Sequence, residues 1–137
     1  MFQATNIITE QDIFKHLTEI QAYCEAHYNQ DNPAAVLERG AQLESYLALT
    51  GKLVADSKYW QDQLLNSEIG KTVKNALDEG GWSASTINKK INSLCKEQNY
   101  LVNWSDRINA VVTHQLDFLR SVVSKHKEEM RQMQWQK

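Results

Sequence analysis

Residues 82–133 read WSASTINKKINSLCKEQNYLVNWSDRINAVVTHQLDFLRSVVSKHKEEMRQM and contain neither Gly nor Pro. Along this stretch, apolar or small residues recur in alternating steps of four and three, a period of about 3.5 residues that is typical of coiled coils. The line expected to face the core comprises Ile87, Ile91, Leu94, Gln98, Leu101, Ser105, Ile108, Val112, Gln115, Leu119, Val122 and His126. The pattern predicts one very long C-terminal helix over residues 83–133.

Local signals mark the start of this helix. Gly80 and Gly81 end the preceding helix, because Gly accepts the left-handed conformation, and Ser83 suits the N-cap of the next. A helix of about fifty residues is roughly 75 Å long, far more than the dimensions of a compact chain of this length. We therefore expect the helix to bend, to lie in an elongated hairpin, or to pack its free end on another chain. The sequence leaves open a break near residues 98–99.

Four members of the core-facing line are polar: Gln98, Ser105, Gln115 and His126. Polar residues in such a seam weaken the packing and can fix the register of the helices. Exposure to solvent is the simpler explanation, and we expect these four side chains to be partly exposed.

Further signals divide the rest of the chain into three helices. Thr9, followed three residues later by Asp12, resembles a capping box and starts the first helix. Pro33 after Asn32 suits the first turn of the second helix, and Ser67 suits the cap of a short third helix. The prediction is a single all-α domain over residues 1–137: an elongated helical hairpin or bundle of three to four helices, at about 9–29, 33–66, 67–79 and 83–133, with coiled-coil-like packing. The fourth helix is expected to be longer than the second, so that its end projects.

The second helix carries a stripe of small residues: Ala41, Ser45, Ala48, Gly51 and Ala55. Small side chains at this spacing allow another helix to approach closely, but they are equally typical of an exposed surface. Gly51 lowers helix stability by about 1 kcal/mol relative to Ala. A bend or a close helix crossing at Gly51 would account for that cost.

Composition and charge exclude several classes of protein. Hydrophobic residues are 42% of the chain, enough for a core, and no apolar run approaches the eighteen or more residues of a membrane span. The first ten residues do not resemble a signal peptide. Cys24 and Cys95 belong to no CxxC pair, as expected for reduced thiols. We expect a cytoplasmic protein without membrane contact.

The net charge of −2 is distributed unevenly along the chain. Residues 1–70 hold ten acidic and four basic side chains, whereas residues 71–137 hold seven acidic and eleven basic ones. The favoured explanation is an acidic N-terminal layer against a basic C-terminal helix, because nucleic-acid-binding domains concentrate their positive charge more strongly. The alternative is nucleic-acid contact through Lys89, Lys90, Lys96, Arg107, Arg120, Lys125, Lys127 and Arg131.

No catalytic motif is found. Di-iron helical bundles need Glu-x-x-His pairs and helical pyrophosphohydrolases need Glu-x-x-Glu pairs, and the chain contains neither. It also lacks a Gly-rich phosphate loop, HExxH and a nucleophile elbow. The prediction is a protein that is not an enzyme and binds no cofactor or metal.

Single residues offer weaker candidates. Cys24 and His27 could form half of a metal site. The favoured explanation is that Cys24 is packed in the core and His27 lies at the surface. His114 and Asp117 share a helix face and are expected to form a structural pair. A further hypothesis is that aromatic side chains stack on nucleic-acid bases with the help of Arg107; they are Tyr59, Trp60, Tyr100 and Trp104. A place in the core is the favoured explanation for these aromatic residues.

Two segments resemble small uncharacterised helical proteins encoded by bacterial viruses and prophages. They are Leu43–Tyr59, LESYLALTGKLVADSKY, and Ser93–Arg120, SLCKEQNYLVNWSDRINAVVTHQLDFLR. The family has no established activity, so the resemblance implies no functional residues. It implies an intracellular product of a phage or mobile element, acting in the bacterial cytoplasm or within a virion. Many such proteins are small oligomers that bind a macromolecule.

Two functional hypotheses follow. The first is a non-enzymatic helical interaction protein that forms homo-oligomers and binds a protein partner. Its self-association would use Val122, Met130, Met133 and Trp135. The second is a nucleic-acid-binding accessory protein that uses the eight basic residues of the C-terminal half.

Overall fold

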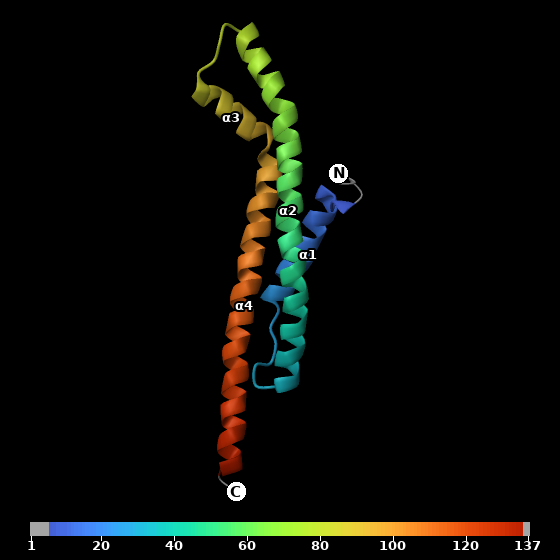
Figure 1. The fold of residues 1–137 in the computed structure, drawn as a ribbon, viewed down its shortest axis with the longest axis vertical. Helices are drawn as coiled ribbons and strands as arrows, with labels where there is room; N and C mark the ends of the chain where they lie inside the picture. Colours follow the sequence, from blue (N-terminus) through green and yellow to red (C-terminus); the bar gives the residue numbers. More distant parts are fainter. Residues whose placement is uncertain (1–5, 136–137) are drawn as a thin grey trace.

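The structure, a computed structural model, describes residues 6–135. They form four helices, α1 (Glu10–Glu25), α2 (Pro33–Asp78), α3 (Ala84–Leu94) and α4 (Lys96–Trp135), and no strand. The predicted all-α fold with a long C-terminal helix is confirmed. Helices α2 and α4 lie side by side in an elongated hairpin, α1 packs against both, and α3 closes one end (Figure 1).

Three of the four predicted helix starts are confirmed in atomic detail. The Thr9 hydroxyl accepts a hydrogen bond from the Asp12 N–H at 3.2 Å. The Asn32 side chain accepts from the Ala34 N–H at 3.0 Å, and the Ser83 hydroxyl caps α3. These short polar side chains satisfy N–H groups that the first turn leaves unpaired. At its other end, α1 stops at Glu25 rather than at residue 29, because the backbone becomes extended at residue 26.

The prediction of a separate helix at 67–79 is wrong. Helix α2 continues without interruption to Asp78 and is 46 residues long, so that it exceeds the 40 residues of α4. Ser67 does not cap a new helix. Its hydroxyl donates to the carbonyl of Leu64 at 2.9 Å, a bond that a residue inside a helix can form.

The prediction of a single helix over residues 83–133 is also wrong, and the break that the sequence left open near residues 98–99 lies at Cys95. Cys95 has φ −99° and ψ 16° and separates α3 from α4, although neither Gly nor Pro is nearby. The break turns α3 against α2, where Ile91 and Cys95 are buried together with Thr72 and Ala76 of α2. Tertiary packing, rather than a local breaker residue, therefore determines where the long helix ends.

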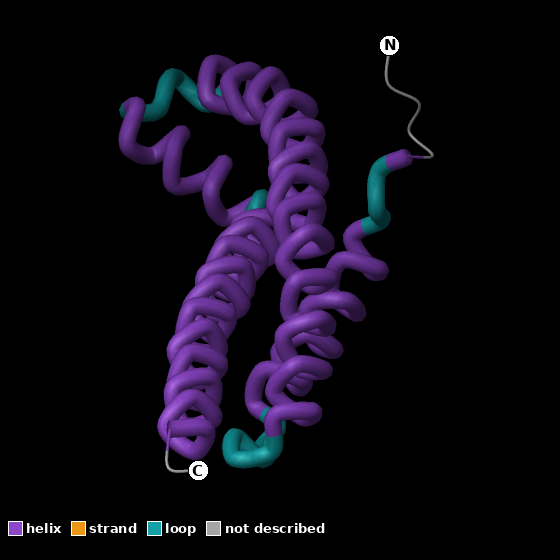
Figure 2. The backbone as a smooth tube through the Cα atoms, turned by 60° about the horizontal axis from the view of Figure 1, so that its bottom comes forward, coloured by secondary structure: helices purple, strands orange, loops and turns teal. Residues whose placement is uncertain are grey.

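The apolar core lies where α1, α2 and α4 meet. Figure 2 shows α1 beside the α2–α4 hairpin, on the side away from α3. The core comprises Ile13, Leu17, Ile20, Cys24, Val36, Leu43, Leu53, Leu101, Ile108, Val112, Leu116 and Leu119. Four of the five α4 members lie on the predicted line, and Leu116 lies beside it. This agreement explains why the period could be recognised in the sequence.

Polar pairs cross the α2–α4 contact and fix its register. The Ser57 and Ser105 hydroxyls lie 3.1 Å apart, and both residues are almost fully buried. Asn109 donates to the Thr50 hydroxyl at 2.9 Å. Because the numbering of α4 falls as that of α2 rises, the two helices are antiparallel.

The four polar residues of the predicted seam all bond to another helix or to the α1–α2 loop. Gln98 donates to Glu10 at 2.9 Å, and Gln115 donates to the Cys24 carbonyl at 2.9 Å. His126 lies 2.8 Å from the carbonyl of Gln30 in the loop. The expectation that simple exposure explains these side chains is wrong for Ser105, which is 0% exposed. Their hydrogen bonds favour a role in register.

The stripe of small residues on α2 is exposed along its whole length. A Cβ added at Gly51 would meet nothing within 4 Å, so no helix crosses there. The proposal of a close crossing at Gly51 is therefore wrong.

We expect Gly51→Ala to raise the free energy of unfolding by about 1 kcal/mol, because Ala loses less backbone entropy in a helix. The thermal midpoint should rise by about 4 °C. Gly81→Ala is the matched control. Gly81 has φ +94°, where a side chain is strained, so this variant should be less stable. A lower thermal midpoint for Gly51→Ala than for the unaltered protein would contradict the open space beside Gly51.

Candidate functional site

The C-terminal end of α4 extends past the α1–α2 loop and the start of α2 (Figure 1). The contact of His126 with the Gln30 carbonyl marks the point where the rest of the fold ends along α4. We call residues 127–135 the α4 tail. Met130 and Met133 in the tail are 62% and 67% exposed, although long apolar side chains are usually buried.

The core-facing seam of α4 continues into the tail. Leu119, Val123, His126, Met130 and Met133 follow one another in steps of four, three, four and three, which keeps them on one helix face. Leu119 is buried and Val123 packs against the core. The two methionines continue the same face beyond the start of α2 at Pro33. They are exposed because α2 and its loop no longer cover that face.

The four predicted self-association residues are thus divided by the structure. Met130 and Met133 share the uncovered face. Val122 is half-buried and packs against the core of the same chain. Trp135 is 84% exposed, but it follows Met133 by two residues, about 200° around the helix, and so lies on the opposite side.

The charged side chains near the tail pair within their own helix. Glu129 lies 4.0 Å from Lys125 and 3.7 Å from His126. Arg131 lies 4.0 Å from Glu128. Exposed pairs of this kind contribute little to stability. They leave the tail without a strong net charge.

The eight basic residues of the nucleic-acid hypothesis do not form one patch. Lys89 and Lys90 lie on α3, at the opposite end of the molecule from the α4 tail (Figure 1). On α4, Arg120 pairs with Asp117 at 2.7 Å. The predicted pair of His114 with Asp117 is not found, because among residues 6–135 no hydrogen bond or ion pair joins these two side chains.

An open groove of about 1250 Å³ lies between the start of α1, the α3–α4 junction and α2. Phe14 and Tyr100 are 54% and 58% exposed at its edge, and both rings pack against Trp104. Its lining comprises Thr9, Glu10, Gln11, Phe14, Trp60, Asn92, Lys96, Glu97, Gln98, Asn99, Tyr100, Leu101 and Asn103. Of the residues proposed to stack on bases, Trp60 and Tyr100 line this groove.

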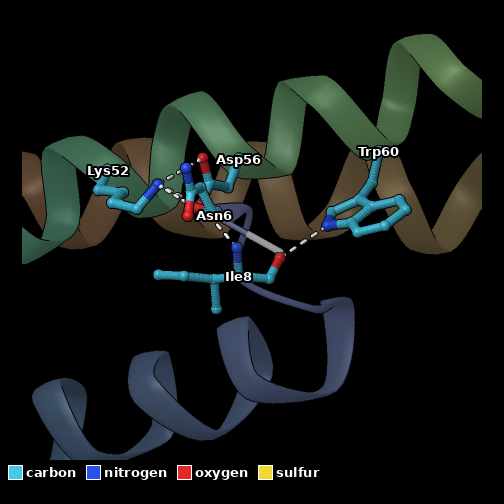
Figure 3. A network of polar contacts seen from close by, with 5 residues as sticks. All are labelled: Asn6, Ile8, Lys52, Asp56 and Trp60. Atoms are coloured by element: carbon cyan, nitrogen blue, oxygen red, sulfur yellow. Dashed lines mark hydrogen bonds and ion pairs between the residues drawn. The ribbon is translucent and has the colours of Figure 1, made fainter. Parts of the chain in front are cut away.

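The segment before α1 is fastened beside this groove by a polar network (Figure 3). The Ile8 N–H donates to the Asp56 carboxylate at 2.8 Å, and the Ile8 carbonyl accepts from the Trp60 indole N–H at 2.7 Å. Lys52 donates to the Asn6 carbonyl at 3.0 Å and pairs with Asp56 at 2.9 Å. Sequence reasoning missed this network, because a single Asp within a helix gives no local signal.

Arg39 is the most unusual buried side chain, at 5% exposure. Its Nη2 donates to the carbonyls of Tyr23 and Cys24, at 3.1 and 3.2 Å, and to the Gln115 side chain at 3.1 Å. The guanidinium also packs on the rings of Tyr23 and Tyr28, 4.7 and 4.3 Å from their centres. It caps the C-terminal end of α1, where the helix dipole favours a cation. A sequence signal existed, because Arg39 continues the seam of α2 three residues after Val36.

The two cysteines are buried and free. Burial raises the pKa of the Cys24 thiol, with the nearby Arg39 charge acting in the opposite direction. Burial also raises the pKa of the Cys95 thiol and of the Tyr23 hydroxyl. Both thiols are therefore less acidic than an ordinary cysteine thiol and form the nucleophilic thiolate less readily. Cys24 and His27 line a cavity of about 280 Å³, and residues 6–135 bring no three His, Cys, Asp or Glu side chains together as a metal site.

Comparisons of the chain with protein-family models, curated proteins and solved structures found no match. Among residues 6–135, no helix combines the length and the apolar character needed to cross a membrane. Among the surfaces described here, the uncovered methionine face of the α4 tail is the clearest candidate for a binding surface.

Proposed function

We propose that this chain is a non-enzymatic helical interaction protein that forms homo-oligomers through the α4 tail. One observation carries the proposal: the core-facing seam of α4 continues past the start of α2 as an exposed face with Met130 and Met133. Burying an apolar side chain of this size contributes about 1.5–3 kcal/mol. Because every copy carries the same face, two tails can cover each other in an isologous contact.

The wider role proposed is that of an accessory or structural protein of a phage or mobile element. The resemblance of segments 43–59 and 93–120 to helical proteins of bacterial viruses supports it. The oligomer would act in the cytoplasm of a bacterial host or within a virion. It would present the surfaces of its hairpins to a protein partner.

The proposal predicts the effect of charge on the tail. Met130→Glu with Met133→Glu should convert the oligomer into a single chain, because two buried carboxylates would face each other without partners. Light scattering behind a sizing column, over a series of protein concentrations, gives the mass. The matched control, Ser124→Glu with Gln132→Glu, adds the same charge away from the methionine face and should keep the mass of the unaltered protein. An unaltered protein that stays a single chain at every concentration would overturn the proposal.

The same experiment tests the nucleic-acid alternative when a short DNA duplex is added at about 50 mM salt, where binding through phosphate contacts is strong. The structure disfavours this alternative, because Arg120, Lys125 and Arg131 each lie within 4.0 Å of a carboxylate of their own helix. A complex with DNA that dissociates steeply as salt is added would favour nucleic-acid binding over the proposal.

A further inference from the structure

We infer that the second copy binds in an antiparallel orientation. Its α4 tail would lie beyond Pro33 of the first chain, end to end with α2 of that chain. There it would cover the α4 tail of the first chain in the way that α2 covers the preceding part of α4. This inference rests on the proposed self-association. It adds the identity of the docking element, the direction in which it runs, and the residues that meet.

The face of the α4 tail continues the contact that α2 and α4 form inside one chain. Helix α2 covers the seam of α4 in antiparallel order, as the Ser57–Ser105 and Thr50–Asn109 bonds establish. Helix α2 begins at Pro33, and the loop before it reaches α4 at His126. The same seam continues for two more turns without a covering helix. An antiparallel helix placed there would meet this seam in the orientation that α2 has.

A parallel orientation of the two tails would meet a steric obstacle. In a parallel pair, the two α4 helices would run together from their tails toward their first turns. Before His126, however, the seam of each α4 is already covered by its own α2 and α1. The two α4 helices would then have to bend apart at the start of the tail. In an antiparallel pair the two hairpins extend in opposite directions, so α4 stays straight, as Figure 1 shows it.

The two methionines set the register. Met130 of each chain lies opposite Met133 of the other, with the two-fold axis between residues 131 and 132. In this register Trp135 of each chain lies opposite Glu128 of the other. The four methionines form one continuous apolar layer.

The expected contact is small. Two overlapping tails of about ten residues are each about 15 Å long, and they bury less than the roughly 1,200 Å² of a stable interface. We therefore expect a dimer that dissociates on dilution. Such a contact can be trapped covalently, which makes its geometry measurable.

The test uses two full-length variants, Met130→Cys and Met133→Cys, which carry different tags and are mixed in equal amounts. Under mild oxidation, the antiparallel register predicts that more than half of the cross-linked product joins Cys at 130 to Cys at 133. Two residues at position 130 would be offset by three positions, about 4.5 Å along the axis, which adds to the helix separation and exceeds disulfide geometry. The unaltered protein is the control, since Cys24 and Cys95 are only 9% and 1% exposed and should not cross-link.

Each outcome decides a different point. An excess of mixed product supports the antiparallel tail. An excess of products joined between identical positions indicates parallel tails, and it overturns the inference while self-association remains. A dimer by light scattering that forms no cross-link places the contact elsewhere and also overturns the inference. A single chain at every concentration, with no cross-link, overturns the proposed function as well.

Discussion

Replacement of Arg39 by Met is expected to lower the free energy of unfolding by about 3 kcal/mol. The substitution keeps the apolar stem but removes the charge and every donor. The carbonyl of Tyr23 would lose its bond to Nη2, and that of Cys24 would keep only its bond to Gln115. The packing of a cation on two tyrosine rings would also be lost.

Urea unfolding followed by circular dichroism measures this loss. Arg107→Met on α4 is the matched control, because Arg107 is exposed and should change the stability by less than about 0.5 kcal/mol. If the two variants were equally stable, Arg39 would not hold the end of α1 against α2 and α4, and its burial would have no energetic role.

The second large effect is expected from Leu43→Ala, which removes a side chain that is 0% exposed at the centre of the core. Lost apolar burial and the remaining cavity together should lower the free energy of unfolding by about 3 kcal/mol. Leu43 faces the junction of α1, α2 and α4, so the variant reports on the contact that joins all three helices.

Leu37→Ala is a close control, because it is the same substitution in the same helix at a residue that is 65% exposed. Its effect should stay within about 0.5 kcal/mol. The difference between the urea midpoints of the two variants measures how strongly this face of α2 is buried. Similar midpoints would contradict the burial of Leu43 and the exposure of Leu37.

Part of the candidate surface could be predicted from the sequence. The sequence predicted that the end of the long C-terminal helix, with Met130 and Met133, projects. The reason it gave was wrong, because α2 with 46 residues is longer than α4 with 40. The projection depends instead on where α2 begins and on the register in which α2 meets α4. The same register places Val122 against the core, although the sequence grouped it with the methionines.

The sequence by itself determined the elements whose causes are local. Thr9, Asn32 and Ser83 start helices because their side chains accept hydrogen bonds from the backbone N–H groups of the next turn. The steps of four and three along α4 specify one apolar face, whatever that face packs against.

Only the tertiary structure decided where the long helices end and which polar groups are buried. The break at Cys95 exists because Ile91 and Cys95 gain burial against α2, and the sequence around it contains no breaker residue. Arg39 is buried because the end of α1 supplies carbonyls and tyrosine rings from another part of the chain. Asp56 fastens the segment before α1 through groups 48 residues away. Such contacts join residues that are distant in sequence, so their free energies appear only once the helices are packed.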